Sequence, residues 1–175
     1  MHSGTIQQRG PKGLRGWLIL VAIMVVAAPI RIAVESAVTF YPIFSSATWS
    51  QMTDLANPAY DLRLTVIILA EIAANAALAL AWFYTAYLFF TKSHRFPLWF
   101  RSVLIGAILF ILVDAFAIKL VMPDTPLFDE TTIKNLVRGV VAAAIWVPYS
   151  LLSKRVRNTF VDEEDWVKKQ AAVFE

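Results

Sequence analysis

The sequence predicts an all-α integral membrane protein, a four-helix bundle with both termini on the cytoplasmic side. Of its 175 residues, 58% are hydrophobic and 17% are charged, whereas about a quarter of the residues of a soluble domain are charged. The charges are also segregated along the chain, which leaves four long apolar runs. The connections between these runs differ in charge, and this difference predicts the orientation of the bundle in the membrane.

Each apolar run is long enough to cross a bilayer, because a membrane core needs about 20 residues of helix. Helices are expected because lipid offers no hydrogen-bond partner to backbone amides. The predicted organisation is one membrane domain, residues 14–160, between two cytoplasmic tails, residues 1–13 and 161–175. The spans within it are expected at about residues 14–38, 62–90, 97–122 and 133–152.

Basic residues gather at alternate connections. The two connections 39–61 and 123–132 contain no Lys or Arg and carry several carboxylates. By the positive-inside rule these two face the periplasm, and the termini and the middle connection face the cytoplasm. The basic clusters that give this orientation are Arg9, Lys12 and Arg15, then Lys92, Arg95 and Arg101, then Lys154, Arg155 and Arg157.

The first periplasmic connection is long enough to hold structure of its own. Trp49, Met52 and Leu55 recur every three residues, ahead of the helix breaker at Asn57-Pro58. This spacing predicts a short amphipathic helix at the outer membrane interface.

Several ionisable residues fall inside the predicted spans, where each one is costly and therefore a functional candidate. Apart from Arg15 and Arg101, near the cytoplasmic ends of their spans, they lie from the middle of the membrane outward, and the inner stretches such as residues 17–28 and 76–90 are free of charge. The sequence therefore predicts a polar network or a periplasm-facing pocket, not a metal site. Its candidate residues are Arg31, Glu35, Glu71, Asn75, Asp114 and Arg138.

Helical spacing says which of these residues share a face. Arg31 and Glu35 are four residues apart, as are Glu71 and Asn75, so each pair lies on one side of its helix. Because an unpaired charge at this depth is expensive, we expect a bridge between helices, from Arg31 to Glu71 or Asp114.

The sequence argues against several functional classes. It contains no cysteine and only two histidines, His2 and His94, both outside the spans. Thiolate or histidine metal sites, haem ligation and a serine–histidine protease are therefore not expected. The basic clusters act as topology signals, so no nucleic acid is expected as a partner. We expect no enzymatic activity and no cofactor.

Three stretches of the sequence together resemble a known family. They are residues 13–18 (GLRGWL), residues 89–97 (FFTKSHRFP) and residues 145–160 (IWVPYSLLSKRVRNTF). The chain is similar to the bacterial inner-membrane proteins catalogued as domain of unknown function 2569. The resemblance implies a four-span protein of the bacterial cytoplasmic membrane, and it implies no activity.

Two hypotheses on function stay open. In the first, the chain binds or transports a small polar or ionic ligand in the charged pocket, with the arginines holding an anionic group. In the second, it is a structural or accessory subunit, and the charges hold helices together within it or against a homo-oligomer or another membrane protein. The alanines of residues 70–81 and the Gly139-x-x-x-Ala143 spacing allow close helix packing under either hypothesis.

Overall fold

The structure, a computed structural model, describes residues 12–160, which fold into helices and connections with no strand. Four of the helices are long and apolar enough to cross a membrane, and the chain is a multi-pass membrane protein. The predicted C-terminal tail, residues 161–175, lies outside the described residues. In chain order the helices are α1 (Trp17–Ser45), α2 (Thr48–Thr53), α3 (Leu62–Phe90), α4 (Phe96–Val121), α5 (Glu130–Leu152) and α6 (Lys154–Thr159).

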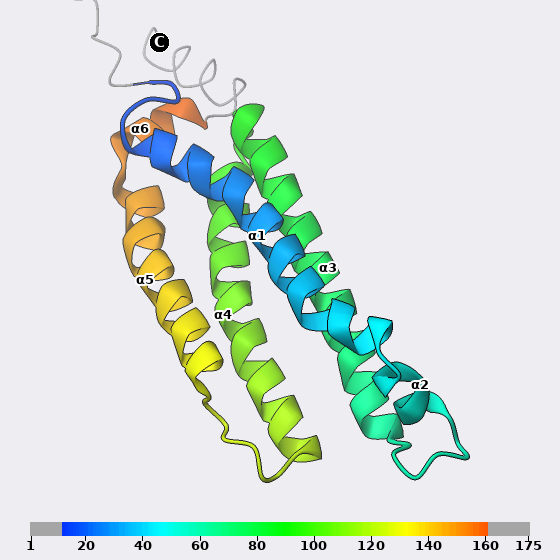
Figure 1. The fold of residues 1–175 in the computed structure, drawn as a ribbon. Coiled ribbons are helices and arrows are strands. Elements are labelled where there is room, and N and C mark those ends of the chain that lie inside the picture. The colour runs from blue at the N-terminus through cyan, green and yellow to red at the C-terminus, as the bar shows by residue number, and fades with distance from the viewer. Residues whose placement is uncertain (1–11, 161–175) are drawn as a thin grey trace, which may run out of the picture.

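The four long helices run up and down as a bundle (Figure 1). Its α6 end carries α6 and the start of α1, and its α2 end carries α2 and the α4–α5 connection. Helix α1 packs on α3, α3 on α4, and α4 on α5. Helix α1 starts near α5 at the α6 end and slants across to α3 at the α2 end (Figure 1). Helices α1 and α5 therefore lie farther apart at the α2 end than at the α6 end.

Helix α1 is longer than predicted at its far end, since it runs to Ser45 and not to Val38. It passes through Pro29 and Pro42 without a break, so neither proline divides the helix into two halves. The extension is held by packing, because Phe40 is buried against Met52 and Ile68. Hydropathy alone ended the span where Thr39 begins a more polar stretch, and it could not include this tertiary contact.

A short helix does occur in the first connection, where the sequence predicted one. Trp49 and Met52 of α2 pack toward the ends of α1 and α3. Leu55 lies beyond the helix and is exposed, so the predicted three-residue pattern does not continue to it. A position at the membrane interface stays a prediction.

Helix α3 begins and ends where the sequence placed it. The side chain of Asp61 caps its start by accepting hydrogen bonds from the amides of Arg63 and Leu64. Its end is a tight turn in which Lys92 takes a left-handed conformation, with φ of 53°. Helix α4 agrees with the predicted span to within one residue at each end, and α5 begins three residues earlier than predicted. Asp129 caps α5, accepting from the amide of Thr132.

The main hydrophobic core fills the α6 end of the bundle. Three phenylalanine rings meet there: Phe160 stacks on Phe96 at a centroid distance of 4.5 Å and lies 5.7 Å from Phe89. The chain is tied to this cluster from both ends, because the Gly13 amide donates to the Thr159 hydroxyl at 3.0 Å. Gly13 has a φ of +93°, a conformation that side-chain-bearing residues rarely adopt. This turn lets the segment before α1 reach α6.

Candidate functional site

All six residues that the sequence singled out line one cavity, of about 530 Å³, between the four long helices. This volume is in the range typical of small-molecule sites, roughly 300–1,000 Å³. Arg31 and Glu35 come from α1, Glu71 and Asn75 from α3, Asp114 from α4 and Arg138 from α5.

Helical periodicity explains why each helix presents one face to this cavity. On α5 the lining residues include Thr131, Asn135, Arg138 and Ala142, separated by four, three and four residues. Residues at this spacing lie on one side of a helix. Asn135, Thr131 and Thr132 were not among the predicted residues. The same spacing rule, applied backward from Arg138, leads to Asn135 and Thr131.

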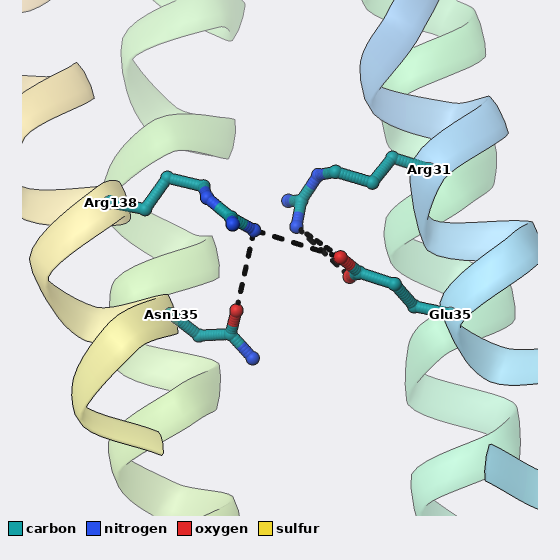
Figure 2. Close-up of polar contacts among 4 residues, drawn as sticks. All are labelled: Arg31, Glu35, Asn135 and Arg138. Atoms are coloured by element: carbon teal, nitrogen blue, oxygen red, sulfur yellow. Dashed lines mark hydrogen bonds and ion pairs between the residues drawn. The ribbon is translucent and has the colours of Figure 1, made fainter. Parts of the chain in front are cut away.

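One ion-pair network crosses the cavity from α1 to α5 (Figure 2). Nη1 of Arg31 donates to both carboxylate oxygens of Glu35, each at 2.9 Å. Nη1 of Arg138 lies 3.6 Å from the Glu35 carboxylate and 3.5 Å from the amide oxygen of Asn135. Arg31 is thus firmly paired, while Arg138 is held by two contacts at the outer limit of hydrogen bonding. A guanidinium has five N–H donors, so Arg138 retains capacity to bind an anion.

The predicted bridge from Arg31 to Glu71 or Asp114 was wrong. Arg31 pairs within its own helix, and the connection between helices is Arg138 to Glu35. The reason is geometric, because the residue four positions along α1 is a neighbour whatever the packing of the bundle.

Glu71 and Asp114 form an acidic part of the cavity wall, on α3 and α4. Neither makes a hydrogen bond or an ion pair with another of residues 12–160, and the two are close enough to interact electrostatically. Two neighbouring carboxylates repel each other unless a proton or a cation lies with them. The cavity therefore has a wall suited to an anion and another suited to a cation or a proton.

The cavity changes from polar to apolar along its length. Its charged residues lie on the side of the α2 end, and its inner end is formed by Met24, Leu78, Trp82 and Leu104. Trp82 and Leu104 are buried and belong to the core at the α6 end, so the cavity is closed in that direction.

Other charged groups of the spans do not join this cavity. The ammonium of Lys119 donates to the backbone carbonyls of Pro123 and Thr125, in the α4–α5 connection. Across residues 12–160, no three histidine or carboxylate side chains are placed to hold a metal ion.

Comparison with known proteins identifies the family. Residues 11–161 match the family described as Protein of unknown function (DUF2569). The chain belongs to this family. The match confirms the resemblance found in the three sequence stretches and covers all the helices of the structure. No curated protein and no solved structure matches the chain.

The stretches that carry the family resemblance come together at the α6 end, away from the charged cavity. Gly13 binds Thr159, and Phe89, Phe96 and Phe160 pack on one another. These contacts join the start of α1, the α3–α4 turn and α6. The motif thus builds the closed end of the bundle, and it does not supply the polar lining of the cavity.

Proposed function

We propose that the chain binds a small polar ligand in the cavity and serves in its transport or retention, without enzymatic activity. The ligand carries an anionic group, held by Arg138 and Arg31, and a cationic group or proton, held by Glu71 and Asp114. The observation that carries the proposal is that Arg138 faces the cavity with its hydrogen-bonding capacity largely unused. A network that served only to hold helices together would be expected to pair it more closely.

The charges of the cavity support a ligand of mixed charge. Its lining includes two arginines and three carboxylates, since Glu35 joins Glu71 and Asp114. A purely anionic ligand would add to an excess of negative charge, whereas a zwitterion would place each of its charges near an opposite one.

The proposal includes a place in the cell, the cytoplasmic membrane of a bacterium with the α6 end in the cytoplasm. Basic residues at the α6 end outnumber those near the α2 end, which include Arg63 near the start of α3, Lys119 in the last turn of α4 and Lys134 near the start of α5. In this orientation the polar part of the cavity lies toward the periplasm.

The test is binding of phosphoethanolamine, a small molecule with an anionic phosphate and a cationic amine, to the purified full-length protein, measured by calorimetry. Arg138→Gln should abolish binding, because it removes the guanidinium that meets the anion. Glu35→Gln should tighten binding about tenfold, equivalent to roughly 1.4 kcal/mol, because the competing internal carboxylate is gone. The matched control is Arg63→Gln, an arginine outside the cavity, and it should change nothing.

The Glu35→Gln variant separates the ligand hypothesis from the structural one. If the network only holds helices together, this variant should lower the unfolding temperature without gaining affinity for phosphoethanolamine. Weaker or unchanged binding in a folded Glu35→Gln protein would contradict the assignment of the anion to Arg138.

A second candidate function is a packing role in a homo-oligomer. It is favoured by an apolar groove on the outer side of α3 and α4, lined by small residues that include Ala74, Ala77, Ala81 and Gly106. Gly106→Leu should prevent a second copy from binding in this groove, and cross-linking in lipid nanodiscs would detect the loss of the dimer. Finding monomers only in the unmodified protein would exclude the candidate.

A further inference from the structure

The cavity has one side that is not sealed by helix packing. Three of its sides are closed by contacts of α1 with α3, α3 with α4, and α4 with α5. Helices α1 and α5 meet at the α6 end, where Trp17 and Trp146 lie 6.3 Å apart. Farther along, the bridge between them is the ion pair of Glu35 with Arg138 (Figure 2). The cavity therefore opens sideways, between α1 and α5.

The charged groups in this opening are half exposed. The exposed fraction is 46% for the side chains of Arg31 and Arg138 and 50% for Glu35. All three belong to helices long and apolar enough to span the membrane, so lipid is what lies outside the opening. Charged side chains facing hydrocarbon are unfavourable by several kcal/mol, roughly 2.5–3.5 on insertion scales, unless a polar group accompanies them. A lipid-like headgroup would provide that group.

The inner end of the cavity suits an alkyl chain. Met24, Leu78, Trp82 and Leu104 offer no charged group there, and Ala28, Ala107 and Ala142 leave room beside them. Water needs two to four polar partners to remain in a cavity, and an apolar cavity that lacks them stays dry or takes an apolar guest. The polar-to-apolar order of the lining matches an amphiphile in the leaflet at the α2 end, with its headgroup outward and its chain toward the bilayer centre.

We infer that the ligand is a single-chain amphiphile with an aminoalkyl phosphate headgroup, admitted from the membrane between α1 and α5. The phosphate meets Arg138 and Arg31, displacing Glu35 from Arg138, and the amine meets Glu71 and Asp114. The chain lies against Met24, Trp82 and Leu104. This inference rests on the proposed function and adds the alkyl chain and the path by which the ligand reaches the site.

The first experiment compares three probes on the full-length protein in a non-ionic detergent, by native mass spectrometry. The probes are lysophosphatidylethanolamine, phosphoethanolamine, which lacks the chain, and monoacylglycerol, which lacks both charges. We expect the lysolipid to be retained about tenfold more strongly than either of the others. Equal retention of lysolipid and phosphoethanolamine would overturn the amphiphile while leaving the proposed function intact. Retention of neither would overturn both.

A matched pair of variants then locates the chain. Ala107→Phe fills the apolar end of the cavity without touching the charged residues, whereas Ala73→Phe adds the same ring to an exposed position of α3 outside the cavity. Lysolipid retention should fall about tenfold in the first variant and stay unchanged in the second. Phosphoethanolamine binding should survive in both. An equal effect of the two variants would contradict the position of the chain.

The second experiment needs no variant and so does not depend on the folding of Ala107→Phe. A lysophosphatidylethanolamine with a photoactivatable group at the end of its chain is added to the unmodified protein in lipid nanodiscs. Cross-links should fall on Met24, Leu78, Trp82 or Leu104. Cross-links confined to outward-facing residues such as Leu80 and Leu120 would show ordinary lipid contact and overturn the inference.

Discussion

Replacing Phe160 by alanine should open the α6 end of the bundle. The ring is 5% exposed, stacks on Phe96 at 4.5 Å and lies 5.7 Å from Phe89. Phenylalanine-to-alanine changes in protein cores cost about 3–5 kcal/mol, of which each aromatic pair accounts for roughly 0.5–1.5 kcal/mol. Phe160 follows the last span and packs at the end of the bundle, where its neighbours can close part of the space. We therefore expect the lower part of that range, about 3 kcal/mol.

The assay is equilibrium unfolding in mixed detergent micelles, followed by tryptophan fluorescence. Phe160→Leu is the matched control, since it keeps most of the apolar volume and should cost less than about 1.5 kcal/mol. Trypsin should also cut faster at Lys154 or Arg155 of α6 in the alanine variant than in the leucine variant. Equal destabilisation by alanine and leucine would show that the stacked rings do not hold α6 in place.

Two further predictions concern α5. Gly139→Leu should destabilise the bundle by about 1–3 kcal/mol in the same unfolding assay, because an added Cβ would lie 3.2 Å from Ile108 of α4. Gly106→Leu is the control and should not destabilise it, because nothing lies within 4 Å of an added Cβ there. Equal effects of the two variants would contradict this packing. Hydrogen bonding from Thr132 lowers the pKa of Asp129 from its usual value of 3.8. The charged carboxylate therefore stabilises the folded protein above about pH 4, and this stabilisation is lost as the pH falls through the lowered pKa. Asp129→Asn keeps a capping oxygen and should remove this acid dependence, whereas Asp129→Ala should lower stability at pH 7 by about 1 kcal/mol. If stability depends on acid pH in Asp129→Asn as it does in the unmodified protein, the acid dependence does not come from Asp129.

The sequence was sufficient for the helices that local signals define. Helix α3 was predicted at both ends because its apolar run has clear limits, since Asp61, a strong capping residue, precedes it and polar residues follow Phe90. The end of α1 was missed because it depends on Phe40 meeting Met52 and Ile68, residues that are distant in the sequence. Helix α6 was not predicted as a separate element, since it is only six residues long and is held by Val156, Thr159 and Phe160 packing on the core.

The members of the candidate site were predictable, and their pairing was not. Ionisable residues in apolar runs stand out in any sequence, and helical spacing assigns each to a face. Which charges meet depends on the order of the helices around the bundle. Arg138 reaches Glu35 because α5 stands opposite α1 across the cavity, and the sequence contains no signal for that arrangement.

The separation of the two ends of the bundle bears on what family membership can say. The residues that carry the resemblance, among them Gly13, Thr159 and Phe160, make contacts that close the α6 end. They account for the scaffold, and the cavity is lined by residues from other parts of the same helices. A change at Phe160 should therefore lower stability and ligand binding together, whereas a change at Arg138 should lower binding alone. Measuring stability and ligand binding for both variants separates the residues that stabilise the bundle from those that bind the ligand.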